Sequence, residues 1–180
     1  MRDVAGDALV TVDAGAHMLV AMPLWHTDDP NAVLISSGLA TMGFASPAAI
    51  GGAIAQPGRR VVCLTGDGAL GMTLAELEVI SRLALPIAVI VFNDSALRMI
   101  ELKQDEAAHG GSNAVRYRDI DFAGAARALG VAAHRVASVP ELERALSSGV
   151  GEDPVVIDAV VDPSGYSDVL RAIPGARTSV

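Results

Sequence analysis

Two short polar segments, each following an apolar run, contain residue types that could do chemistry. Gly66-Asp67-Gly68 follows the apolar run 61–65, and Asn93-Asp94 follows the run 87–92. Glycines let a backbone turn sharply, and amides at such a turn favour an anion such as phosphate. Because Asp67 would repel bare phosphate, a divalent cation between them would resolve the conflict, and Mg²⁺ commonly uses one or two carboxylates with phosphate oxygens. Taken alone, Gly66–Gly68 is more simply explained as a turn with an aspartate hydrogen bond.

The elements that must position these segments alternate along the chain. Apolar runs predict strands at 8–13, 33–36, 61–65, 87–92, 131–136 and 155–160, and helical spacing occurs at 47–56, 73–85, 122–129, 140–148 and 167–172. Most runs are continuously apolar, which is typical of parallel strands covered on both faces. Pro47 suits a first helical position, Thr73 with Glu76 predicts a capping box, and Gly130 suits a helix end.

This alternation predicts a doubly wound α/β domain, with helices on both faces of a mainly parallel sheet. We expect residues 1–180 to form one domain, with a loose tail after about residue 174. The segment 105–119 lacks periodicity and is predicted to be a loop of functional length, such as a lid. Since carboxyl ends of parallel strands meet at one sheet edge, Asp67 and Asp94 should lie near each other there. That pairing is what a Mg²⁺–diphosphate site needs.

Composition excludes several classes of function. The 180 residues are 51% hydrophobic and carry 13 Lys+Arg against 21 Asp+Glu, a net charge of −8 that argues against nucleic-acid binding. Cys63 is the single cysteine, so an internal disulfide and a cysteine-cluster metal site are excluded, and its apolar neighbours predict a buried side chain. The sequence contains no apolar stretch long enough for a membrane span and no signal-peptide layout at Met1–Val4, so we expect a cytoplasmic protein.

Together, Gly66-Asp67-Gly68 and Asn93-Asp94, at about the right spacing, resemble the diphosphate-binding motif of thiamine diphosphate (ThDP) enzymes. The resemblance implies ThDP and Mg²⁺ as cofactors. It implies that the metal is held by Asp67, by Asp94 and by the backbone carbonyl of Ala96. Asp94 stands where the family has the second asparagine of an Asn-Asn pair, a change that keeps an oxygen donor and adds charge.

Further segments extend the likeness toward acetolactate synthase-like enzymes. The segment Ser37–Gly51 is similar to their Gly-x-Met-Gly segment, which implies that Met42 wedges against the cofactor and that the Ala40 carbonyl accepts from its amino group. Taken alone, Met42 would more simply be core filling. Gly15-Ala16-His17 resembles a Gly-Gln-His turn that contacts the diphosphate; Ala16 loses the glutamine contact, and His17 either donates to phosphate or caps a turn.

The likeness runs from about Leu9 to Tyr166 and includes the segments 97–104, 122–130 and 154–158. The cofactor contacts that it implies are Gly15, Ala16, His17, Ala40, Met42, Gly66, Gly68, Ala69, Asn93, Ala96 and Leu97.

The resemblance implies half of an active site. In the family, the glutamate that activates the cofactor comes from a separate pyrimidine-binding domain, and neither Glu76 nor Glu101 can be assigned its role, so we place no catalytic residue in this chain. We predict the diphosphate- and Mg²⁺-binding half of a ThDP enzyme acting on a 2-oxo acid, a carboligase or decarboxylase that works as a homo- or hetero-oligomer with a pyrimidine-binding domain or subunit.

Three alternatives remain open at this point. One is a separate subunit of a sulfopyruvate or phosphonopyruvate decarboxylase-type enzyme, and another is a non-catalytic binding module. The third is a Rossmann nucleotide-binding domain, which would need Gly-x-Gly-x-x-Gly after the first strand, where the chain has only Gly15.

Overall fold

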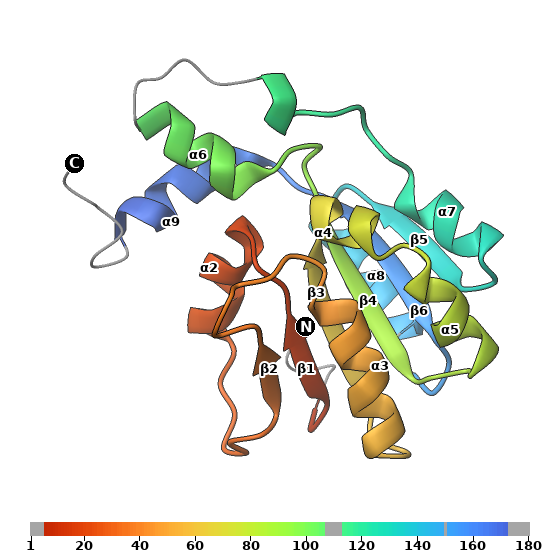
Figure 1. The fold of residues 1–180 in the computed structure, drawn as a ribbon. Coiled ribbons are helices and arrows are strands. Elements are labelled where there is room, and N and C mark those ends of the chain that lie inside the picture. Colours follow the sequence, from red (N-terminus) through yellow and green to blue (C-terminus); the bar gives the residue numbers. More distant parts are fainter. Residues whose placement is uncertain (1–5, 107–112, 150, 173–180) are drawn as a thin grey trace.

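The described part of the chain is built around one parallel sheet (Figure 1). The computed structural model describes residues 6–106, 113–149 and 151–172. The strands are β1 (Leu9–Val12), β2 (Val33–Ile35), β3 (Val61–Gly66), β4 (Ile87–Asn93), β5 (Ala132–Val136) and β6 (Val155–Val160). They are all parallel and lie in the order β2-β1-β3-β4-β6-β5. This confirms the predicted fold class, because a βα alternation with continuously apolar strands produces a sheet buried on both faces.

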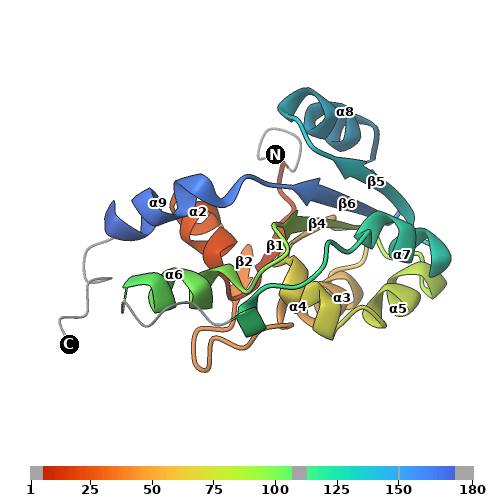
Figure 2. The same ribbon diagram turned by 90° about the horizontal axis from the view of Figure 1, so that it is seen from above.

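Helices cover both faces of the sheet, as Figure 2 shows. They are α2 (Ala16–Leu24), α3 (Ala45–Ala55), α4 (Asp67–Met72), α5 (Glu76–Arg82), α6 (Arg98–Glu106), α7 (Phe122–Ala128), α8 (Val139–Gly149) and α9 (Tyr166–Ala172), with 3-10 turns η1 (Asn113–Val115) and η2 (Pro163–Gly165). Successive strand residues point to opposite faces. Val61 and Cys63 therefore pack with α3, α5 and α7, whereas Val62 and Leu64 pack with α2 and α8.

The site lies where the chain changes direction across the sheet. From β1 the chain passes through α2 to β2, and from β3 it passes through α4 and α5 to β4 on the other side, so neighbours β1 and β3 flank a topological switch point. Ligands in open α/β folds bind at the carboxyl ends of strands at such a point. The register pairs Gly66 with Phe92, so β3 and β4 end level with each other.

Three local expectations about helices are wrong. The segment 73–85 is not one helix, because α4 begins at Asp67 directly after β3 and α5 begins at Glu76. Thr73 caps the carboxyl end of α4, where its hydroxyl donates to the Ala69 carbonyl at 3.2 Å, so no capping box forms. Pro47 is the third residue of α3 and not the first as predicted; it is tolerated there because the missing N–H still falls within the first turn and costs no helical hydrogen bond. Gly130 has φ +84° just after α7, which confirms its predicted role.

The predicted loop 105–119 is anchored beside β4. Residues 105 and 106 belong to α6, and residues 107–112 lie outside the described residues, as does the predicted loose tail. The chain returns through η1, and Arg116 forms an antiparallel bridge with Ala96. Within the described ranges, no helix is both long and apolar enough to cross a membrane.

Candidate functional site

The carboxylate of Asp67 connects the turns that follow β3 and β4. Its side chain is 4% exposed, and its Oδ1 accepts a hydrogen bond from the amide of Gly68 at 2.7 Å. Its Oδ2 accepts from the amides of Ser95 at 2.7 Å and Asp94 at 3.2 Å. Burial raises the pKa of Asp67, and the amides of Gly68 and Ser95, which favour the charged form, oppose that shift. Asp67 and Asp94 are therefore in direct contact, as the strand order predicts.

The turn that carries Asp94 combines an unusual backbone with an ion pair. Ser95 has φ +58°, in the left-handed region that residues other than glycine rarely adopt. The side chain of Asp94 is 5% exposed, and the Nε of Arg98 donates to its Oδ2 at 2.7 Å. Between described residues, no hydrogen bond to its Oδ1 is formed. The Ala96 carbonyl accepts from the Arg98 amide at 2.8 Å, which leaves it a second lone pair.

His17 presents an unpaired nitrogen at the same edge of the sheet. Its ring is buried and stacks on Phe92, with centroids 5.4 Å apart. Burial lowers its pKa to about 4, against an opposing hydrogen bond with the Asp13 backbone, so the imidazole is neutral at pH 7. Its Nε2 has no hydrogen-bond partner among the described residues. A Cβ at Gly66 would stand 3.3 Å from this ring and one at Gly15 2.8 Å, so both glycines make room for it.

Asp13 fixes the loop that carries Met42. This fully buried carboxylate follows β1, and its Oδ1 accepts from the amide of Gly43 at 2.9 Å. Its Oδ2 accepts from the amide of Ala45 and the hydroxyl of Thr65, both at 3.2 Å. The loop also contains Ala40 at φ +48°, a second non-glycine residue in the left-handed region. One side chain thus joins the ends of β1 and β3 to the start of α3.

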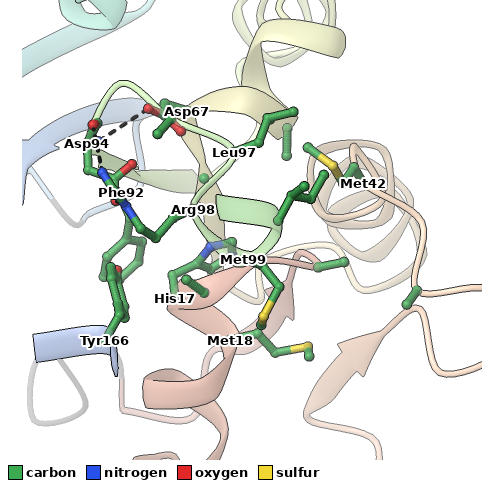
Figure 3. A pocket seen from close by; sticks show the side chains of 18 residues that line it. His17, Met18, Met42, Asp67, Phe92, Asp94, Leu97, Arg98, Met99 and Tyr166 are labelled. Carbon is green, nitrogen blue, oxygen red and sulfur yellow. Dashed lines mark hydrogen bonds and ion pairs between the residues drawn. The ribbon is translucent and has the colours of Figure 1, made fainter. Parts of the chain in front are cut away.

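These turns enclose a pocket of about 280 Å³. Figure 3 shows Asp67, Asp94 and Arg98 grouped at one end and Met42 at the other. From the loops after β1 and β2, the predicted residues that line it are Gly15, Ala16, His17, Ala40 and Met42. From those after β3 and β4, they are Gly66, Asp67, Ala69, Asp94, Ala96 and Leu97.

Two predicted cofactor contacts lie outside the pocket lining. Asn93 is buried, and its amide donates to the Ile120 carbonyl and to Asp158, both at 3.0 Å, so its side chain braces β4 against β6. Gly68 lies behind the wall, and a Cβ there would stand 2.6 Å from Leu97 Cδ2 and 3.4 Å from Met42 Cε. Their roles as cofactor contacts stay predictions.

Sequence reasoning missed aromatic and charged residues at the site. Phe92, Arg98 and Tyr166 line the pocket, and Asp13 supports it. Asp13 could have been found, because it is an acidic residue directly after a buried strand at the same edge. Tyr166 arrives from α9, 72 positions after Asp94 (166 − 94), and no local pattern signals this approach. Burial raises the Tyr166 pKa to about 12, so its hydroxyl keeps its proton.

The residues present fit a diphosphate with a hard metal ion. Two carboxylates and a carbonyl are the oxygen donors that Mg²⁺ prefers. Across the ranges that the structure describes, no group of three or more His, Cys, Asp or Glu side chains could hold a metal. A cation here would therefore need backbone and ligand oxygens besides Asp67 and Asp94. The unpaired Nε2 of His17 gives the same pocket a polar atom, which accepts in the neutral ring because the other nitrogen donates to the Asp13 backbone.

Comparisons with known proteins agree with this geometry. Residues 13–159 match the family described as thiamine pyrophosphate enzyme, C-terminal TPP binding domain. The chain is 37% identical over 163 residues to the acetolactate synthase of Bacillus subtilis (strain 168), covering 90% of this chain and 28% of that protein. It is 35% identical over 166 residues to the acetolactate synthase isozyme 3 large subunit of Escherichia coli K12, covering 89% and 29%.

A solved structure shows the same fold. The thiamine diphosphate-dependent 4-hydroxybenzoylformate decarboxylase of Rhodococcus jostii RHA1 superposes with a TM-score of 0.80 at 21% identity, covering 88% of this chain and 30% of that one. The chain thus spans less than a third of the length of these relatives. The family match covers most of the described sheet and every turn of the pocket from Asp13 to Leu97. The chain belongs to the thiamine pyrophosphate enzymes, as a C-terminal TPP-binding domain of the acetolactate synthase-like kind.

Proposed function

We propose that this chain is the diphosphate- and Mg²⁺-binding half of a ThDP-dependent enzyme that acts on a 2-oxo acid, an acetolactate synthase-like carboligase or decarboxylase. The observation that carries the proposal is the hydrogen bond from the backbone amide of Asp94 to the carboxylate of Asp67, at the level ends of β3 and β4. The unpaired Nε2 of His17 adds a polar atom to the same pocket. The identity with acetolactate synthases favours this over the separate decarboxylase subunit, since the decarboxylase neighbour shows the fold alone.

Each group at the site has a role under this proposal. Asp67, Asp94 and the Ala96 carbonyl would hold Mg²⁺, and His17 would lie beside the diphosphate. Because His17 is neutral and its other ring nitrogen donates to the Asp13 backbone, its Nε2 is an acceptor without charge, so it would meet a diphosphate oxygen through a water molecule or a protonated oxygen. Met42 and the Ala40 carbonyl, which line the pocket, would contact the cofactor, and that carbonyl could accept a hydrogen bond from its amino group. When bound, ThDP supplies the electron sink for decarboxylation of a 2-oxo acid.

The activating carboxylate has to come from a partner domain. The only acidic side chains among the described residues that line the pocket are Asp67 and Asp94, which the metal occupies. Glu101 is buried and pairs with both Arg98 and Arg116, so it is not available as a proton relay.

Apolar side chains around the Met42 loop indicate where a partner would dock. Leu39 is 90% exposed and precedes Ala40 in the pocket wall, and Met72 and Ile100 are exposed nearby. Exposed apolar groups beside a ligand pocket are typical of surfaces that another protein covers. We therefore propose a homo- or hetero-oligomer in which a pyrimidine-binding domain closes over this face.

Calorimetry of ThDP binding, with Mg²⁺ and then with EDTA, tests the metal bridge. We expect removal of the metal and the change Asp94→Ala each to weaken ThDP binding at least about tenfold, and Asp94→Asn, which keeps an oxygen donor, to retain binding. Asp168→Ala, which removes an exposed carboxylate paired with Arg171, is the matched control. Binding that ignores both chelation and the Asp94 variants would overturn the metal bridge, and no binding at all would favour a non-catalytic module.

A further inference from the structure

Arg98 brings a positive charge into the wall of the cofactor pocket. It is the first residue of α6, its side chain is 13% exposed, and it lies beside Asp94 in Figure 3. Its Nε donates to Asp94 Oδ2 at 2.7 Å, and a terminal nitrogen reaches the Asp94 carbonyl at 3.4 Å. A side-chain cation therefore already occupies one oxygen of a carboxylate that the proposed function assigns to the metal.

Arg98 also has an anchor that does not depend on Asp94. Its other terminal nitrogen pairs with the carboxylate of Glu101, three residues further along the same helix. Glu101 is buried, and Arg116 from the returning segment pairs with its second oxygen. Residues three apart on a helix are neighbours, so Arg98 can keep Glu101 while it gives up Asp94. The ion pair with Asp94 can thus open without exposing Glu101 as an unpaired buried charge.

We propose that Arg98 is an internal counter-ion, which a divalent cation must displace from Asp94 and which then turns to the diphosphate. The inference rests on the proposed function. Arginine is well suited to this exchange, because its planar guanidinium binds carboxylates and phosphates with the same parallel N–H groups. The pocket gives it both partners, since Asp94 and Arg98 line the same cavity. Metal binding in this chain therefore depends on the diphosphate, which receives Arg98 when the metal takes Asp94.

Loss of the Arg98 charge should act in opposite directions on the two ligands. A metal ion alone competes with Arg98 for Asp94, so removing the guanidinium strengthens metal binding. A diphosphate without metal is attracted by Arg98, so the same change weakens anion binding. A residue with a purely structural role would weaken both, and this difference in sign separates the two roles.

The test uses the full chain with Mn²⁺, followed by electron paramagnetic resonance of the free ion, and with inorganic diphosphate in EDTA, followed by calorimetry. For Arg98→Met we expect Mn²⁺ alone to bind about tenfold tighter and diphosphate alone about tenfold weaker than for wild type. Arg82→Met is the matched control, because it removes the same charge from an exposed pair with Glu78 and should change neither affinity. In wild type, diphosphate should tighten Mn²⁺ binding at least about tenfold.

Two results would overturn the role of Arg98. One is an Mn²⁺ affinity in Arg98→Met equal to or below that of Arg82→Met. If circular dichroism shows that Arg98→Met is unfolded, Arg98→Gln replaces it in the comparison, because glutamine keeps an N–H donor without charge. The other is wild-type Mn²⁺ binding that diphosphate does not change. Wild type that binds neither Mn²⁺ nor ThDP with Mn²⁺ would overturn the proposed function as well, whereas intact ThDP binding alongside either result overturns only the inference.

Discussion

Replacing Asp13 with alanine should destabilise the cofactor side of the sheet more than any surface change. The carboxylate is fully buried and accepts four hydrogen bonds, from the amides of Ala14, Gly43 and Ala45 and from the hydroxyl of Thr65. Alanine would leave the amides of Ala14, Gly43 and Ala45 without this acceptor, while the Thr65 hydroxyl keeps the Gly66 carbonyl at 3.3 Å. The backbone between β1 and α3 would then lose the group that holds it.

The expected size follows from the bonds themselves. A hydrogen bond to a charged group contributes about 1.5–3 kcal/mol, and a buried donor left unpaired costs about 1–3 kcal/mol. These values do not add, and the desolvation of the carboxylate, which raises its pKa, offsets part of the gain. We therefore expect Asp13→Ala to lower the free energy of unfolding by about 3–5 kcal/mol. For a chain of this length, that corresponds to a decrease in Tm of about 10 °C or more.

Urea unfolding followed by circular dichroism measures the loss directly. Asp168→Ala, whose side chain is 79% exposed, should stay within about 0.5 kcal/mol of wild type. Because the same bonds position Met42, ThDP affinity should fall in Asp13→Ala at temperatures where the variant remains folded. A variant less than about 1 kcal/mol from wild type, with unchanged ThDP affinity, would refute the view that Asp13 anchors the loop.

Three further predictions follow from the same structure. Burial raises the pKa of Asp13 above its ordinary 3.8, so the folded chain binds the carboxyl proton of Asp13 more tightly than the unfolded chain does. The stability that Asp13 contributes is therefore greatest below about pH 4 and declines as the pH rises through the folded pKa. Urea unfolding from pH 4 to 8 should show this decline relative to Asp13→Asn, and a difference that grows with pH would contradict it. Burial raises the pKa of Cys63 to about 12, so a thiol reagent should label the chain only on unfolding, and rapid labelling of the folded chain would disprove this. The chain alone should release no CO₂ from pyruvate or a related 2-oxo acid. Addition of a pyrimidine-binding domain should restore CO₂ release, and Asp94→Ala should abolish the restored activity. Efficient turnover without a partner would show that the activating acid lies in this chain.

The sheet and its edge could be predicted because they depend on local signals. Val61–Thr65 and Ile87–Phe92 are almost continuously apolar, a pattern that is typical of parallel strands covered on both faces. Both form central strands of the sheet. Asp67 and Asp94 follow those strands, and parallel pairing alone places them together. Their proximity follows from the pairing of the strands and does not depend on how the side chains pack.

The remaining features depend on contacts between distant segments. The helix α2 has Gly15 as its N-cap, no capping side chain and Pro23 inside, so its sequence carries few helix signals. Thr73 resembles an N-cap in sequence, but Asp67 starts α4 at the strand end, and Thr73 falls where that helix stops. Arg98 gives no sign in the sequence that it belongs to the pocket, because its position follows from the fold of the turn at Ser95.

Charge at the site gives a physical reason why metal and diphosphate belong together. Under the proposed function, the charged side chains among the described residues that line the pocket are Asp67, Asp94 and Arg98, which sum to −2 + 1 = −1, while His17 is neutral. A net charge of −1 weakens the binding of an anion such as diphosphate, although Arg98 itself attracts it. A divalent cation changes the sum to −1 + 2 = +1, and it gives the buried Asp67 carboxylate a partner that favours its charged form. The metal thus converts a cavity whose net charge disfavours the diphosphate into one whose net charge favours it, and the diphosphate in turn gives Arg98 a partner in place of Asp94.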